Sequence, residues 1–68
     1  EYSVKDRKTN IRNLLHTKKK AYLEELIEEY NKPYVVVTFL SILEMVKEND
    51  IIIKQDKNFD RILVELRS

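Results

Sequence analysis

The chain has no glycine and no cysteine, and Pro33 is its only proline. Without cysteine there is no disulfide and no thiolate ligand for a metal, and the single histidine, His16, cannot complete a zinc site by itself. Without glycine there is no loop whose backbone can close around a phosphate. These absences argue against a metal centre and a nucleotide site, and we expect no cofactor.

Long apolar runs are missing as well. Every apolar stretch is far shorter than the about 20 residues that a membrane-spanning helix needs, and nothing resembles a signal peptide. We therefore expect a cytoplasmic chain without membrane contact. Its 68 residues allow one domain at most, here residues 1–68. Because the chain begins with Glu1 instead of Met, we expect it to be an excised domain or a trimmed piece of a longer protein.

The charges nearly cancel, with 13 lysines and arginines against 12 aspartates and glutamates and a net charge of +1. Such a balance gives no long-range attraction to nucleic acid or to an anionic membrane. The basic residues gather at two places, first at Lys5, Arg7 and Lys8 and then at residues 18–20. They are interpreted most simply as a solvated face, and otherwise as a weak nonspecific contact with phosphates.

The first half of the chain predicts a short strand and two helices. Residues 2–4 alternate apolar and polar side chains, as an extended segment does. Asp6 suits the N-cap of a helix that ends near Thr17. A second helix is expected at about residues 19–30, with leucine and isoleucine on one face and glutamates on the other.

Pro33 begins the most apolar segment, which predicts a third helix to about Glu48. On a helical wheel, side chains within an arc of roughly 160° are expected to form the core, namely Val35, Val36, Phe39, Leu40, Ile42, Leu43 and Val46. The opposite, polar face is expected to meet solvent through Thr38, Ser41, Glu44, Lys47 and Glu48. Val37 and Met45 lie outside the apolar arc, without an obvious place in the core.

Two strands complete the chain, at residues 51–55 and 61–66, because β-branched and other apolar residues dominate both segments. A polar loop at residues 56–60 joins them and carries Phe59. The expected order is a short N-terminal strand, three helices and a C-terminal β-hairpin wing. This is the α+β arrangement of a winged helix.

Residues 35–46 read Val-Val-Val-Thr-Phe-Leu-Ser-Ile-Leu-Glu-Met-Val. They closely resemble a helix near the end of bacterial kleisins, the segregation and condensation protein A (ScpA) family, which typically has valines and then Thr-Phe-Leu-Ala-Leu-Leu-Glu-Leu. The residues that look like the hairpin of that family are Ile51, Ile53, Gln55, Phe59 and Ile62. The resemblance spans nearly the whole chain. It departs from the family after Phe59, where Asp60-Arg61 replaces the usual Gly-Asp.

The resemblance implies a role, because a kleisin bridges the two ATPase heads of an SMC (structural maintenance of chromosomes) dimer. This chain would be the C-terminal winged helix that docks on one SMC head. Other parts of the parent protein would bind the neck of the second head and the partner ScpB. The implied function is that of a noncatalytic, nucleoid-associated adaptor in chromosome condensation and segregation, which meets DNA only indirectly through the complex.

A partner surface is expected where apolar side chains exceed what the core needs. If alternate residues of each strand face inward, Ile52 and Leu63 point outward. Several such residues on a small domain favour a contiguous patch that a partner covers over scattered exposure. The residues expected to contact the SMC head are Val37, Met45, Ile52, Phe59 and Leu63.

Three other functions compete with docking. A winged helix of a transcription regulator reads the major groove with its third helix, but the polar face here offers Glu44, Glu48 and only one strong base, Lys47. A self-associating module would use the apolar surplus as a homodimer seam. An enzyme has no support, because His16 has no identifiable acid partner or nucleophile. We therefore expect neither catalysis nor a small-molecule substrate.

Overall fold

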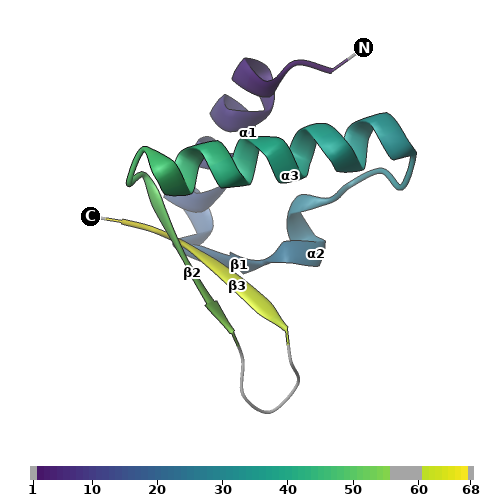
Figure 1. Cartoon of the computed structure of the whole chain (residues 1–68). Helices are drawn as coiled ribbons and strands as arrows, with labels where there is room; N and C mark the ends of the chain where they lie inside the picture. Colours follow the sequence, from purple (N-terminus) through teal and green to yellow (C-terminus); the bar gives the residue numbers. More distant parts are fainter. Residues whose placement is uncertain (1, 56–60, 68) are drawn as a thin grey trace.

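The computed structural model describes residues 2–55 and 61–67. Its elements are α1 (Val4–Lys18), β1 (Lys20–Tyr22), α2 (Leu23–Leu26), α3 (Lys32–Lys47), β2 (Ile51–Gln55) and β3 (Ile62–Leu66). The strands form one antiparallel sheet in the order β1-β3-β2, and α3 crosses it (Figure 1). Three helices followed by a hairpin that completes a small sheet make a winged helix, so the predicted fold class is confirmed.

The predicted N-terminal strand is wrong, because residues 2–4 contain none. The side chain of Ser3 accepts a hydrogen bond of 3.0 Å from the backbone N–H of Asp6 and caps α1, so the helix begins earlier than predicted. The third strand of the sheet is β1 instead, whose Ala21 lies opposite Val64. The chain turns from α1 into β1 at Lys19, whose φ is 74°. The N–H of Lys19 donates to the carbonyl of Leu15 at 2.8 Å.

The second helix is much shorter than predicted. α2 has four residues, and Ile27 already takes extended backbone angles at its C-cap. The pairs Glu24–Glu28 and Glu25–Glu29 would place like charges one turn apart, which opposes continuation of the helix. The chain therefore crosses from α2 to α3 in an extended form.

The core lies between α1, α3 and one face of the sheet. Its buried apolar side chains are Ile11, Leu15, Ala21, Leu26, Ile42, Met45, Ile51 and Val64. In α1 the inward residues recur at helical spacing, and in the hairpin every second residue faces inward. The predicted outward position of Met45 is wrong, since this side chain is 0% exposed at the centre of the core.

The orientation of α3 is nearly opposite to the predicted one. Thr38 and Ser41, expected to face solvent, are both 0% exposed. Four of the seven residues expected in the core are exposed, namely Val36 (45%), Phe39 (42%), Leu40 (50%) and Leu43 (57%). Of the seven, Ile42 alone is buried.

α1 covers the polar side of α3 because the side chains there are small enough for a close approach. Ser41 Oγ donates to the carbonyl of Val37 at 2.7 Å and lies 3.3 Å from the carbonyl of Val4 in α1. Thr38 Oγ1 accepts a hydrogen bond of 3.2 Å from Arg7 Nε. Both hydroxyls therefore have partners, which removes the cost of burying them.

Arg7 is the polar centre of this contact and is only 6% exposed. Its Nη2 donates to the carbonyl of Leu26 at 2.8 Å, and its guanidinium carbon lies 4.7 Å from the centroid of the Tyr34 ring. The side chain thus joins all three helices. The expectation that Arg7 belongs to a solvated basic face is wrong.

We expect the substitution Thr38→Leu to destabilise the domain by about 1–3 kcal/mol, because it overpacks the α1–α3 contact and removes the acceptor of Arg7. The matched exchange Leu40→Thr on the exposed side should stay within about 0.5 kcal/mol of the parent. Urea denaturation followed by circular dichroism measures both. A larger loss for Leu40→Thr than for Thr38→Leu would contradict the orientation of α3.

Candidate protein-interaction surface

Apolar side chains from α3 and β2 remain exposed on one side of the domain. We call this surface the apolar face, and it consists of Val36, Phe39, Leu40, Leu43 and Ile53. The four α3 residues follow one another at spacings of three or one, so they share one side of the helix. Scattered exposed apolar residues are ordinary, but a group on one side of so small a domain is a candidate interaction site.

A shallow groove of about 180 Å³ continues the apolar face between α3 and the hairpin. Every lining residue is apolar: Leu23, Phe39, Ile42, Leu43, Ile53, Ile62 and Val64. The groove therefore joins the outer side of α3 to the inner face of the sheet. It offers a partner an apolar depression without hydrogen-bonding side chains.

Ile53 is exposed because β2 is an edge strand that runs away from the end of α3. Ile51 and Ile53 lie on the same face of β2, but Ile51 is 1% exposed and Ile53 is 42% exposed. In the sheet, β2 has β3 as its neighbour on one side, and it runs away from the end of α3, as Figure 1 shows. Val64, the register partner of Ile53 on the central strand β3, is 0% exposed on the same face, so the exposure is confined to the edge of the sheet.

The five predicted contact residues do not gather on this surface. Met45 is in the core, and Val37 is half-buried on α3. Ile52 and Leu63 are half-buried on the outer face of the sheet, where Glu65 and Lys54 are their register partners. Phe59 lies outside the described residues. A contact of Val37, Ile52 or Leu63 with a partner stays a prediction.

Sequence reasoning missed the apolar face because it assigned the same residues to the core. The signal that could have found it is the small size of Thr38 and Ser41, three positions apart on the side taken to be solvated. Small residues permit close helix packing, and short hydroxyl side chains can bond to backbone carbonyls when they are buried. The other half of the signal is Arg7, whose guanidinium can supply donors to a buried polar contact.

Ion pairs connect the elements around the core. Lys8 Nζ lies 2.9 Å from both Glu44 and Glu48, which fixes α1 along the last turns of α3. Hydrogen bonds from Lys8 to these two carboxylates raise its pKa. Lys18 pairs with Glu25, and the pKa of Glu25 is lowered, first by that hydrogen bond and then by the N–H of Tyr22.

Neither a metal site nor a membrane span is evident in the described part of the chain. Residues 2–55 and 61–67 hold no group of three or more histidine, aspartate or glutamate side chains placed to bind a metal ion. None of the helices in those ranges combines the length and the apolar character needed to cross a bilayer. The apolar face is the candidate interaction surface of this winged-helix domain.

Comparison with known proteins identifies the family. A sequence model of the family "Segregation and condensation protein ScpA" matches residues 1–67. Segregation and condensation protein A of Clostridium acetobutylicum is 37% identical over 65 residues, and that of Bacillus licheniformis is 38% identical over 65 residues. The protein of the same name from Listeria innocua is 34% identical over 67 residues.

These alignments cover 94%, 94% and 96% of the chain, respectively. The chain belongs to the ScpA family. It spans about a quarter of the length of the curated relatives it matches, with 26%, 26% and 27% of those proteins covered.

The Lys18–Glu25 pair predicts a pH dependence of stability. The folded pKa of Glu25 lies below its ordinary value of 4.5, so the pair stabilises the fold above that value and is lost as the pH falls through the folded pKa. We expect Glu25→Gln to be less stable than the parent at pH 7, with a difference that shrinks as the pH is lowered to about 3. Urea denaturation across this pH range measures it.

The control for this series is Glu28→Gln, because Glu28 is exposed and forms no ion pair with any described residue. Its stability difference from the parent should be small at both pH values. A Glu25→Gln difference that stays constant from pH 7 to 3 would contradict the role of the ion pair.

Proposed function

We propose that the chain is a noncatalytic adaptor that docks on an SMC ATPase head through the apolar face. The observation that carries this proposal is the exposure of Phe39, Leu40 and Leu43 on one side of α3, 42–57% each. Membership of the ScpA family supports it, since the relatives are segregation and condensation proteins. The kleisin resemblance supplies the partner, because it implies a C-terminal winged helix that binds one SMC head.

An interface of standard size would cover only a part of this domain. A standard protein interface covers about 800 Å² on each partner, which is about a sixth of the 4893 Å² that the domain exposes. Covering half-exposed leucine and phenylalanine side chains contributes about 1 kcal/mol each before the costs of association. A few anchors of this kind at the centre and charged side chains at the rim can give a stable, specific interface.

Within the complete complex the domain would hold one end of a kleisin against one SMC head. Other parts of the parent protein would bind ScpB and the second head, so that a closed ring forms for chromosome condensation and segregation. The domain would influence ATP hydrolysis only by fixing the geometry of the heads. Such a complex would work in the cytoplasm, at the nucleoid.

A sequence-reading transcription regulator gains no support. In that mode the outer side of the third helix must present hydrogen-bonding side chains to base edges. Here that side presents Val36, Phe39, Leu40 and Leu43. These apolar side chains suit another polypeptide better than the polar floor of a major groove.

We expect Leu43→Glu to weaken binding to a purified SMC head at least tenfold, because it places a carboxylate at the centre of the apolar contact. Isothermal titration calorimetry with the full chain measures the affinity. The matched control is Asn13→Glu, which adds the same charge at an exposed position of α1 away from the apolar face. Both variants should keep the circular dichroism spectrum and melting temperature of the parent.

An affinity for the head that changes less than twofold in Leu43→Glu would contradict this docking surface. The variants Ile52→Glu and Leu63→Glu test the outer face of the sheet in the same assay. If these two weaken binding and Leu43→Glu does not, the head lies against that face instead.

A further inference from the structure

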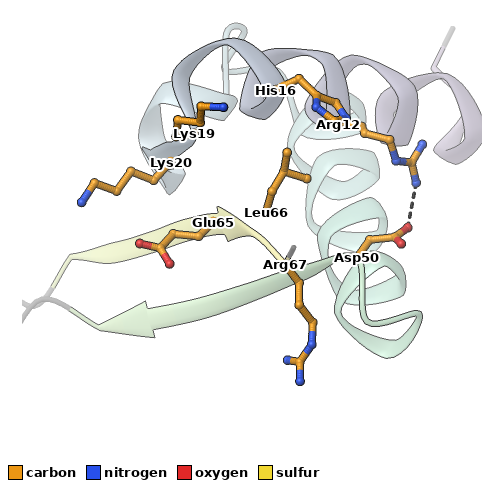
Figure 2. Close-up of a pocket in the computed structure, with 8 residues that line it drawn as sticks. All are labelled: Arg12, His16, Lys19, Lys20, Asp50, Glu65, Leu66 and Arg67. Atoms are coloured by element: carbon orange, nitrogen blue, oxygen red, sulfur yellow. Dashed lines mark hydrogen bonds and ion pairs between the residues drawn. The ribbon is translucent and has the colours of Figure 1, made fainter.

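A second surface lies where the C-terminal end of α1 faces the ends of the sheet strands (Figure 2). It is an open cleft of about 710 Å³. We call it the basic cleft, after its cationic and imidazole side chains Arg12, His16, Lys19, Lys20 and Arg67. Asp50, Glu65 and Leu66 complete its lining, and none of these residues belongs to the apolar groove.

The two carboxylates of the cleft are already neutralised. Asp50 pairs with Arg12 at 2.7 Å, drawn as the dashed line in Figure 2, and Glu65 pairs with Lys54 at 3.3 Å. The side chains of Lys19, Lys20 and Arg67 are exposed. None of these three has a carboxylate partner among residues 2–55 and 61–67. The cleft therefore carries a local excess of positive charge.

The opposite end of α1 is mixed in charge. Asp6, Glu28 and Glu29 line a cavity near the N-terminus of α1 together with the cation Arg7, and none of the three carboxylates forms an ion pair within the described chain. α1 has 15 residues and is thus about 22 Å long at 1.5 Å per residue. That length is more than two Debye lengths of about 8 Å at physiological salt. The excess of positive charge at the basic cleft is therefore a local property, which the net charge of +1 does not reveal.

The cations of the basic cleft do not converge on one point. In Figure 2 the side chains of Lys20 and Arg67 extend away from the sheet in different directions, and Lys19 lies beside the end of α1. A small anion is held by donors that point at a common centre. Separate exposed cations instead suit an extended polyanion, which can place a different phosphate at each of them.

We propose that the basic cleft contacts the phosphodiester backbone of DNA without reading its sequence, while the apolar face is occupied by protein. This inference goes beyond the proposed function, in which DNA is met only indirectly. The relatives are segregation and condensation proteins, so DNA is the polyanion that such a domain would meet. The winged helix thus uses the end of α1 and the end of β3 toward DNA, and keeps α3 for protein.

The test is fluorescence anisotropy of a labelled 30-base-pair duplex of random sequence, titrated with the full chain between about 25 and 150 mM potassium chloride. The triple variant Lys19→Gln, Lys20→Gln, Arg67→Gln should bind at least tenfold more weakly at the lowest salt. Its slope of log K against log salt should be smaller by about two to three, since each phosphate that a cation neutralises releases about 0.9 counterions.

The matched control removes the same charge elsewhere, through Lys5→Gln, Lys32→Gln and Lys47→Gln, which lie at exposed positions near the ends of α1 and α3. It should change DNA affinity less than twofold. Equal weakening by both triple variants would overturn the proposal, because net charge alone would then explain binding. Unchanged affinity in the cleft variant would overturn it as well.

Two further arms separate this proposal from the docking proposal. The cleft variant should bind the SMC head like the parent, and Leu43→Glu should bind DNA like the parent. Inorganic phosphate at 10 mM, at constant ionic strength, should not displace the duplex, whereas full displacement would overturn the proposal in favour of a small-anion pocket. If the triple variant melts at a lower temperature than the parent, the double variant Lys20→Gln, Arg67→Gln takes its place. It leaves Lys19, which has a positive φ, unchanged. Unchanged DNA affinity in the double variant would overturn the proposal.

Discussion

The packing of α1 against the polar side of α3 is the contact on which the rest of the structure depends. Arg7 sits at its centre, with hydrogen bonds to Thr38 Oγ1 and the Leu26 carbonyl and its guanidinium over Tyr34. α1 packs on the polar side of α3, and the sheet packs on the neighbouring side. The remaining side of α3 is not covered by any element of the described chain. The apolar face is therefore a consequence of how the core closes.

This arrangement separates two kinds of surface on one small domain. α3 and the inner face of the hairpin present apolar side chains and a groove lined only by apolar residues. The end of α1 and the end of β3 present exposed cations whose nearby carboxylates are already paired. Because the two surfaces share no lining residue, the proposed protein partner and the proposed DNA contact would not compete for the same side chains.

Much of the fold could be predicted from the sequence, because periodicity and terminating residues are local signals. The helix after Pro33 and the strand at residues 51–55 lie close to their predicted bounds. β1 could not be found this way, since residues 20–22 become a strand only by pairing with β3. The same limit explains why the second helix was predicted to begin too early, whereas its early end at Leu26 agrees with a local signal, the repulsion between glutamates one turn apart.

The burial of individual residues on α3 was predicted less well than the fold, because a helical wheel ranks sides by hydrophobicity and not by shape. An apolar surplus outside the core was expected, but some residues were assigned to the wrong group. Met45 was placed outside the core and is buried, whereas Leu43 was placed in the core and is exposed. The chain has no cysteine, so single-cysteine variants can test this orientation directly by their rates of reaction with a thiol reagent. We expect Leu43→Cys to react rapidly, to become protected when the SMC head is added, and to react far faster than Thr38→Cys if α3 has the orientation described. Slow reaction at Leu43→Cys and rapid reaction at Thr38→Cys would contradict it.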